Sequence, residues 1–311
     1  PQSCASSIYI NDGHGKFTDE TAKWNASLKN MGIVTDAVWA DVNHDNIKDL
    51  IVVGEWMPPT IFINDHKTLT ASLLNKQLDS LKGWWNTITA DDIDKDGNSD
   101  LILGNYGLNS QLKASVKQPV ELYSTDIDDN GTIDPILTSY YGDKSFPFIM
   151  MDDLNMQVPS LRKKFLDYTS YADATISDII PSQKLSALKP LQANTFSTII
   201  LKNTGNGFTV EQLPAEAQYA PVFAVCCVDV NKDGDDDLLL FGNNNYNRIR
   251  IGRLDANHGM LFLNDGKGKF SYVPQYKSGF NIRGDVRSAL MMNNKLFIGV
   301  NNKPVQVYQL H

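Results

Sequence analysis

The sequence predicts an all-β fold built from repeated four-stranded antiparallel units, and three observations lead to this prediction. An Asp-rich segment occurs four times, each copy lies between two short apolar runs, and hairpin turns of the Asn-Asp-Gly type recur between further apolar runs. A strand, a loop and a second strand followed by a hairpin give four antiparallel strands, which is the composition of one propeller blade. We therefore expect a β-propeller of such blades.

Short apolar runs of strand length flank each Asp-rich segment. Runs of this kind, bounded by turn residues, are typical of buried strands. The strands expected before the four segments are Ala37–Ala40, Asn86–Ala90, Val120–Tyr123 and Val222–Val228. The strands expected after them are Leu50–Val53, Leu101–Leu103, Ile136–Leu137 and Leu238–Phe241.

Hairpin turns supply the outer two strands of a unit. Asn-Asp-Gly between apolar runs is a strong hairpin signal. Such hairpins, or similar ones, are expected at Ile8–Phe17, Ile199–Phe208 and Leu261–Phe270. A fifth unit, Val286–Leu310, keeps the strand patterns of Leu296–Val300 and Val305–Tyr308 but lacks the Asp-rich segment. Because the sequence begins in a hairpin, we expect it to be a piece of a longer chain.

Residues Met151–Leu191 interrupt the β pattern. Their sequence predicts short helices at Pro159–Leu166, Tyr171–Ile180 and Ser182–Leu188. Ser160 and Ser182 are the expected N-caps, because a serine hydroxyl can accept a free N–H group of the first turn. We therefore expect a single β-propeller domain, or a fragment of one, over residues 1–311, with about five visible blades and a helical insertion at 151–191.

The Asp-rich segments have the composition of calcium-binding loops. Each carries oxygen-bearing side chains at positions 1, 3, 5 and 9, with Gly or Asn at position 6 for a left-handed turn. Calcium takes six to eight oxygen ligands, and a backbone carbonyl at position 7 could add one. The predicted metal ligands are Asp41, Asn43, Asp45, Ile47, Asp49, Asp92, Asp94, Asp96, Asn98, Asp100, Asp126, Asp128, Asn130, Thr132, Asp134, Asp229, Asn231, Asp233, Asp235 and Asp237.

Two alternatives to these calcium loops can be weighed. An EF-hand needs a Glu at position 12 and a following helix, whereas position 12 here is apolar and lies in a predicted strand. Asx turns without metal are the second alternative. Without a metal ion, the crowded carboxylates within each of the four loops would repel one another, so we favour several bound calcium ions. Their role should be structural, because one short loop supplies every side-chain ligand and no base or nucleophile lies beside it.

Composition excludes some classes of protein. The 311-residue chain has a net charge of −8, which argues against nucleic acid as a partner. No apolar stretch has the ~18 residues of a membrane span. The chain has three cysteines, Cys4, Cys226 and Cys227, and an odd number does not make a disulfide framework. Cys226 and Cys227 lie in an apolar run, where we expect them to be core residues.

A candidate ligand face lies opposite the Asp-rich loops. The loops join the first strand of a unit to the second, so the connection after the second strand lies at the other end. That connection is rich in Gly, Asn and aromatic residues. Aromatic faces and amides suit sugars or a protein loop, although the same residues could shape turns and pack between blades. The candidate ligand-binding residues are Glu55, Trp56, Asn105, Tyr106, Tyr140, Tyr141, Asn245 and Tyr246.

Beyond these patterns, the sequence resembles FG-GAP/VCBS repeat proteins, whose repeats also build the calcium-binding blades of integrin α-subunit propellers. The segments Val53–Pro58, Gly83–Asn86, Gly104–Ser110 and Leu261–Gly268 are similar to the large secreted type from Bacteroidetes, associated with ASPIC/UnbV proteins. The resemblance implies a seven-bladed propeller in the complete protein, an export signal and a secreted, cell-surface or periplasmic location. It implies no established enzymatic activity.

We therefore expect a non-catalytic calcium-binding propeller that serves as a cell-surface binding or adhesion module for a glycan or a protein. One alternative is a carbohydrate-active enzyme, a polysaccharide lyase or hydrolase, for which Glu55 and Asp143 are the nearest acid candidates. Another is a structural accessory subunit of an outer-membrane nutrient-uptake complex with a transporter as partner. The five histidines are scattered without ligand or triad spacing, which leaves little support for catalysis.

Overall fold

The computed structural model describes residues 5–248 and 250–309, so Cys4 and Leu310 lie outside the part described. The fold is mostly β, with 38% strand and 16% helix, and contains several four-stranded antiparallel sheets. This much of the fold prediction is confirmed. The chain forms two compact units, one comprising the residues up to Gln111 and from Phe196 onward, the other Leu112–Thr195.

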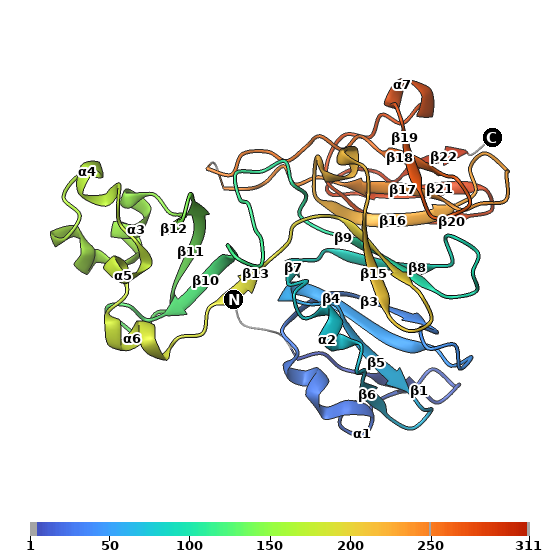
Figure 1. Cartoon of the computed structure of the whole chain (residues 1–311), viewed down its shortest axis with the longest axis horizontal. Helices are drawn as coiled ribbons and strands as arrows, with labels where there is room; N and C mark the ends of the chain where they lie inside the picture. Colours follow the sequence, from blue (N-terminus) through green and yellow to red (C-terminus); the bar gives the residue numbers. More distant parts are fainter. Residues whose placement is uncertain (1–4, 249, 310–311) are drawn as a thin grey trace. The chain divides into compact units, whose positions relative to one another are not determined.

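The first unit contains four successive antiparallel sheets (Figure 1). The first sheet is formed by β3 (Ile33–Ala40), β4 (Asp49–Met57), β5 (Thr60–Asn64) and β6 (Leu69–Ala71), with β7 (Gly83–Trp84) paired to β4. The second consists of β8 (Thr87–Asp91), β9 (Asp100–Gly104), β14 (Ile199–Asn203) and β15 (Phe208–Gln212). The third consists of β16 (Val222–Val228), β17 (Asp237–Gly242), β18 (Met260–Asn264) and β19 (Phe270–Val273). The fourth has three strands, β20 (Val286–Met292), β21 (Lys295–Val300) and β22 (Gln306–Gln309).

These sheets pack on one another through their first strands. The strand β3 contacts β8, β8 contacts β16, and β16 contacts β20. Side chains of each strand contribute to two cores, because neighbouring residues point to opposite faces of the sheet. Leu101 and Leu103 lie in the core shared with the first sheet, whereas Ile102 lies in the core shared with the third. The sheets form an open succession, and no closed ring is seen among residues 5–248 and 250–309.

Glycine in the second strand of a sheet permits a close backbone approach. A Cβ on Gly54 would lie 2.1 Å from the carbonyl oxygen of Ile33, and one on Gly242 would lie 1.7 Å from that of Pro221. Beside both glycines the first strand of the sheet carries a register shift, so its carbonyl turns toward the second strand. The sequence places glycine there for this approach, not for a left-handed turn.

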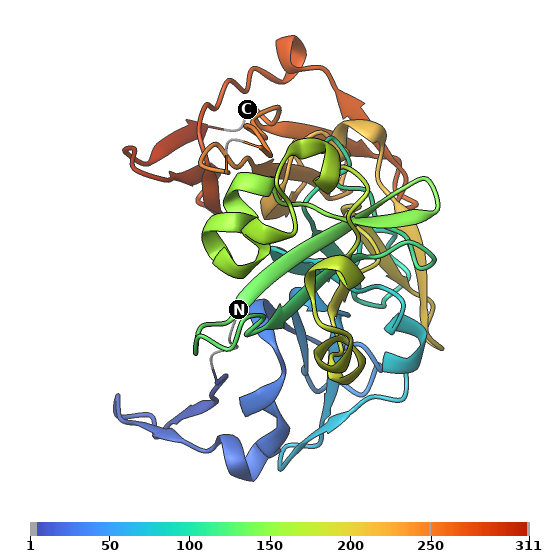
Figure 2. The same ribbon diagram turned by 90° about the vertical axis from the view of Figure 1, so that its left-hand side faces the viewer.

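Short elements accompany the first unit's sheets. The N-terminal hairpin of β1 (Tyr9–Asn11) and β2 (Phe17–Asp19) is exposed throughout and stands apart from the sheets in Figure 2. The helical segments are α1 (Thr21–Asn25), η1 (Ala26–Asn30), α2 (Asn75–Leu78), η3 (Ala215–Gln218) and α7 (Gln275–Ser278). Within the described part of the chain, none of the helices has the length and hydropathy of a membrane span.

The second unit is inserted between β9 and β14. These strands pair in register, Leu101 with Leu201, although the whole unit separates them in sequence. Sequence order assigns the hairpin of β14 and β15 to the third Asp-rich segment, but it completes the sheet of the second. The inserted unit is also wider than the expected helical insertion, because it includes a sheet. Its strands are β10 (Val120–Thr125), β11 (Asp134–Tyr141), β12 (Lys144–Pro147) and β13 (Leu191–Ala193).

The sheet of the second unit departs from the blade order. Its order is β12-β11-β10-β13, so the last strand pairs with the first strand of the meander instead of extending the outer edge. The chain reaches that edge through α3 (Met151–Gln157), η2 (Pro159–Lys163), α4 (Tyr168–Tyr171), α5 (Ile176–Ile179) and α6 (Ser182–Ala187). These helices share a core with the sheet, which contains Ile136, Leu154 and Ile180.

The N-caps of these helices differ from those expected. Ser160 and Ser182 lie inside their helical segments, whose N-cap positions are Val158 and Pro181 and make no side-chain bond. Instead, Asp167 and Thr175 form capping boxes at α4 and α5. The expected helix Tyr171–Ile180 is therefore shortened to α5, because the capping box at Thr175 starts the helix at Ile176.

Candidate functional site

The four Asp-rich loops follow the same backbone course. In each, the carboxylate at position 1 accepts the backbone N–H of position 6, with bond lengths of 2.7–3.0 Å. Position 6 has a positive φ in every loop, at Asn46, Gly97, Gly131 and Gly234. Asn and Gly tolerate this conformation best, which explains why the sequence has only these residues there.

The carboxylate at position 9 is buried in every loop. At most 1% of Asp49, Asp100, Asp134 and Asp237 is exposed. In the three loops of the first unit, one oxygen of this carboxylate accepts the backbone N–H of an Asn that ends the third strand, at 2.7–2.9 Å. These three residues are Asn64, Asn203 and Asn264.

Two of these asparagines also join neighbouring sheets. The side-chain Nδ2 of Asn203 donates to the carbonyl of Val42 in the first loop at 3.0 Å, and that of Asn264 donates to Ile93 in the second loop at 2.7 Å. Sequence reasoning treated Asn203 and Asn264 only as hairpin residues. Their recurrence at the end of the third strand of each sheet was the sequence signal that could have indicated this role.

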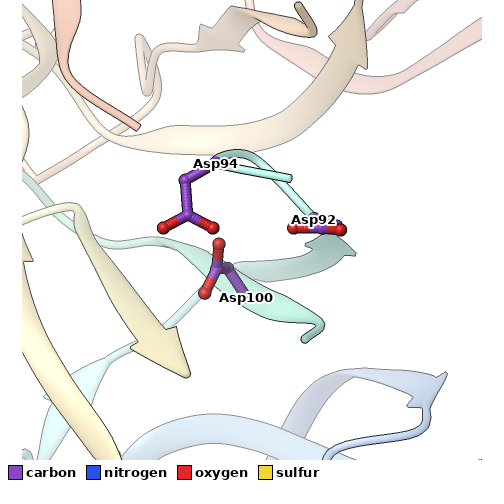
Figure 3. Close-up of side chains that lie close together, drawn as sticks. All are labelled: Asp92, Asp94 and Asp100. Carbon is purple, nitrogen blue, oxygen red and sulfur yellow. The ribbon is translucent and has the colours of Figure 1, made fainter. Parts of the chain in front are cut away.

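In the second and third loops, the side chains of positions 1, 3 and 9 converge. Asp92, Asp94 and Asp100 each have a carboxylate oxygen within 4.8 Å of the others (Figure 3). Asp126, Asp128 and Asp134 form an equivalent triad in the second unit. Carboxylates this close repel one another unless a proton or a cation lies between them. Either triad can hold a metal ion.

Three oxygens of these triads test whether a cation fits. Asp94 Oδ1, Asp100 Oδ2 and Asp128 Oδ1 are buried and have no hydrogen-bond partner in the described part of the chain. Buried polar atoms nearly always have a partner, so their absence here requires an explanation. A hard cation bound by carboxylate oxygens supplies one. The donor set therefore fits a calcium-type ion.

The electrostatics of Asp100 agree with this fit. Burial, with added repulsion from Asp94 and Asp96, raises the pKa of Asp100 to about 7 despite the hydrogen bond from Asn203. Burial also raises the pKa values of the other position 9 carboxyls, Asp49, Asp134 and Asp237. Ionisation of these buried carboxyl groups is therefore unfavourable unless a cation is bound beside them.

The first and fourth loops differ at position 3. They carry Asn43 and Asn231 there, whose Nδ2 atoms donate to the position 5 carboxylates of Asp45 and Asp233 at 2.8 and 2.7 Å. Within residues 5–248 and 250–309, the acidic side chains of these two loops do not form a further triad. Calcium binding by these loops stays a prediction.

Turn bonds coexist with the triads. In each loop the side-chain oxygen at position 5 accepts the N–H of position 7 at 2.8–2.9 Å, as in an Asx turn. The pairs are Asp45 with Ile47, Asp96 with Asn98, Asn130 with Thr132, and Asp233 with Asp235. The turn bond uses position 5, whereas the triads use positions 1, 3 and 9. The two explanations of the loops therefore apply to different side chains.

Lysine side chains lie beside the loops. Lys202 Nζ is 2.5 Å from Asp94 Oδ2, and Lys95 Nζ, in the second loop, is 2.5 Å from Asp235 Oδ1 in the fourth. In the second unit, Lys184 Nζ lies 2.7 Å from Asp129 Oδ1. These ammonium groups offset part of the acidic charge, and no local sequence pattern identified them.

A cavity lies in the first unit among the connections at the opposite strand ends from the Asp loops. Its volume is about 600 Å³, within the range of small-ligand sites. Leu108 follows the end of β9, and Tyr219 precedes β16, so the strand connections supply both. The lining combines these side chains with Asn109, Gln212 and Leu213. None of these lining residues is among the ligand-binding residues predicted from the sequence, and ligand binding at these strand ends stays a prediction.

The predicted ligand residues fall into separate groups. Glu55, Trp56, Asn105 and Tyr106 meet around Trp84, where the Asn105 side chain is fully buried and accepts the N–H of Trp84 at 3.2 Å. Tyr140 and Tyr141 lie on β11 of the second unit. Asn245 donates both its backbone N–H and its side-chain Nδ2 to Asp285, and Tyr246 is 80% exposed. The amide groups of Asn105 and Asn245 therefore serve the fold.

Comparison with known proteins adds no assignment. No protein-family model matches the chain, and no curated protein matches it at a significant level. Function must therefore be argued from the loops, the cavity and the aromatic residues of the chain itself.

Proposed function

We propose that this chain belongs to a calcium-stabilised β-propeller of the FG-GAP/VCBS kind and acts as a non-catalytic, cell-surface binding module for a glycan or a protein. The observation that carries this proposal is the pair of Asp triads whose buried oxygens lack partners. Calcium at all four loops would neutralise these carboxylates and tie the first and second strands of each sheet together.

The succession of sheets supports the propeller architecture. In the first unit, neighbouring sheets pack through their first strands, as blades do around a central axis. Their three Asp loops all join a first strand to a second, so the loops lie at the same strand ends. Further blades would be needed to complete a ring.

The opposite strand ends support a role in binding. Function in such folds lies in loops carried by a rigid scaffold. The cavity between these connections combines an aromatic ring, Tyr219, with apolar and amide side chains, and Tyr219 is 44% exposed. Sugars and protein loops both present apolar surface together with hydrogen-bonding groups, which this lining can match.

Thermal unfolding with and without a chelator tests the metal part of the proposal. We expect millimolar calcium to raise the melting temperature above that in EDTA, because an ion bound only by the folded chain stabilises it. Magnesium at the same concentration should have a smaller effect, since it gives up its water ligands reluctantly. Equal melting temperatures in EDTA and calcium would refute calcium stabilisation.

Ligand screening tests the binding part. The calcium-loaded protein is applied to a glycan array and used as bait for surface proteins, and each hit is repeated with Tyr219→Ala. Tyr276→Ala is the matched control, because Tyr276 is 83% exposed on α7 and does not line the cavity. Loss of binding in Tyr219→Ala alone supports the cavity as the site. Equal binding by both variants contradicts that assignment.

A further inference from the structure

The indole of Trp84 lies at the centre of an aromatic cluster assembled from distant segments. Its ring centroid is 5.0 Å from Trp56, 4.9 Å from Tyr106 and 4.7 Å from Phe196. Glu55 pairs with Trp84 across β4 and β7, so their side chains share one face of the sheet. We call Glu55, Trp56, Trp84, Asn86, Tyr106 and Phe196 the Trp84 cluster.

Three polar atoms of this cluster have no partner. Trp84 Nε1, Asn86 Nδ2 and the Tyr106 hydroxyl are each buried and make no hydrogen bond within the described residues. They belong to one region, because Asn86 donates its backbone N–H to Gly104 at 2.8 Å and the rings of Trp84 and Tyr106 are in contact. Only 9% of Tyr106 is exposed. Buried donors without acceptors in one place indicate a missing ligand or water.

The backbone at Trp56 is strained. Its φ is +64°, a conformation that bulky residues rarely adopt, and it lies at a register shift between Glu55 and Met57. This bulge directs the Trp56 ring against Trp84 instead of leaving it on the opposite face of the strand. Strain of this kind persists where the surrounding structure imposes it, often at binding sites.

The chemistry of the cluster discriminates between ligand classes. An indole N–H and an amide NH₂ can only donate, so the ligand must offer acceptor oxygens. An anionic ligand would lie beside Glu55 without any basic side chain in the cluster. A cationic ligand would find one carboxyl group but would leave the donors unsatisfied. The hydroxyl groups of a neutral sugar both accept and donate, and its C–H faces pack on aromatic rings.

We propose that the Trp84 cluster binds one unit of a neutral saccharide, with Trp84, Asn86 and Tyr106 donating to sugar oxygens and Glu55 accepting from a sugar hydroxyl. This rests on the proposed function as a glycan-binding module and adds a second site, since none of the cluster residues lines the cavity beside Tyr219. The donors are shielded from solvent in the free protein, so binding requires side chains around them to move aside, and the partly buried Trp56, which packs on Trp84, is the candidate for this movement.

Conservative variants test this site. Tyr106→Phe removes only the unpartnered hydroxyl, so the free protein should melt at the same temperature or higher. The same change should weaken binding to neutral oligosaccharides by about tenfold to a hundredfold, and Trp84→Phe should act likewise. The matched control is Trp24→Phe, because Trp24 Nε1 is also buried and unpartnered but packs in the core around Leu28 and Leu69. That control should bind as the wild type does.

The probes are neutral glucan, mannan and galactan oligosaccharides, compared with uronic-acid and amino-sugar oligosaccharides, with affinities measured by calorimetry. Glu55→Gln keeps the shape of the side chain and should also weaken neutral-sugar binding. Absence of neutral-saccharide binding, or selective binding of the charged sugars, overturns the inference. Neutral-sugar binding that Tyr106→Phe and Trp84→Phe leave unchanged also overturns it. The calcium-dependent melting shift and the Tyr219→Ala result test the proposed function independently of this saccharide site.

Discussion

Replacing Asp100 with Asn should change the stability of the first unit in opposite directions with and without calcium. The carboxyl group is fully buried and lies in a triad with Asp92 and Asp94. In EDTA the substitution removes a charge that burial opposes, while the remaining amide oxygen can still accept the N–H of Asn203. In calcium it removes a charged ligand from the ion.

The magnitude follows from the pKa of this group. The difference between about 7 in the folded chain and 3.8 for an ordinary Asp corresponds to about 4 kcal/mol at pH 8, which is an upper limit for the gain in EDTA. A gain of about 1–3 kcal/mol would raise the melting temperature by about 2–4 °C per kcal/mol for a unit of this size. In calcium at 1,000 times its dissociation constant, the variant would forgo about 4.1 kcal/mol of ligand stabilisation. This loss exceeds the gain, so its net stability in calcium should fall by about 1–3 kcal/mol.

Differential scanning calorimetry at pH 8, with EDTA and with calcium, measures the change in stability in each solution. The matched control is Asp79→Asn, the same chemical change at an exposed position of the first unit, which should shift neither transition. If Asp100 served only a metal-free turn, Asp100→Asn would change stability by the same amount in both solutions. That outcome would refute the assignment of the triad to a cation.

Two further predictions concern pH and backbone packing. In EDTA, the stability of the folded chain should fall by about 1 kcal/mol between pH 6 and pH 8 and level off above pH 7. The reason is that the raised pKa of Asp100 keeps a proton on the folded chain that the unfolded chain has already lost. Melting curves at several pH values check this, and a rise in stability over the same range would contradict it. Gly242→Ala should destabilise the first unit by at least about 3 kcal/mol, because its Cβ would lie 1.7 Å from the carbonyl oxygen of Pro221. Gly252→Ala, whose Cβ would meet no atom within 4 Å, should cost only about 1 kcal/mol through its positive φ, and similar urea midpoints for the two variants would refute the reasoning.

Local chemistry made the loops and most strands predictable from the sequence. The Asp spacing and the Gly or Asn at position 6 act within nine residues, so the turn and its acidic side chains follow from the segment alone. The apolar runs on either side are then predicted to be buried strands. Asp92, Asp94 and Asp100 converge once the loop closes, which explains why these candidate ligands could be named from the sequence.

Long-range pairing limited the rest of the prediction. Strands β10 and β11 carry the same local pattern as a blade, so nothing in their sequence separates them from the sheets of the first unit. The pairing of β9 with β14 depends on residues that lie far apart in the chain. The sequence named Glu55, Trp56 and Tyr106 of the Trp84 cluster as candidates but could not show that they meet. The positive φ at Trp56 and the contact of Trp84 with Phe196 arise only after three segments come together.

The insertion between β9 and β14 bears on how the chain folds. With 94 residues between Gly104 and Ile199, closing this sheet from a disordered chain costs about 4 kcal/mol of loop entropy. Prior folding of Leu112–Thr195 replaces that disordered loop with a structured segment and lowers the cost. We therefore expect the second sheet to form only after the inserted unit has become compact.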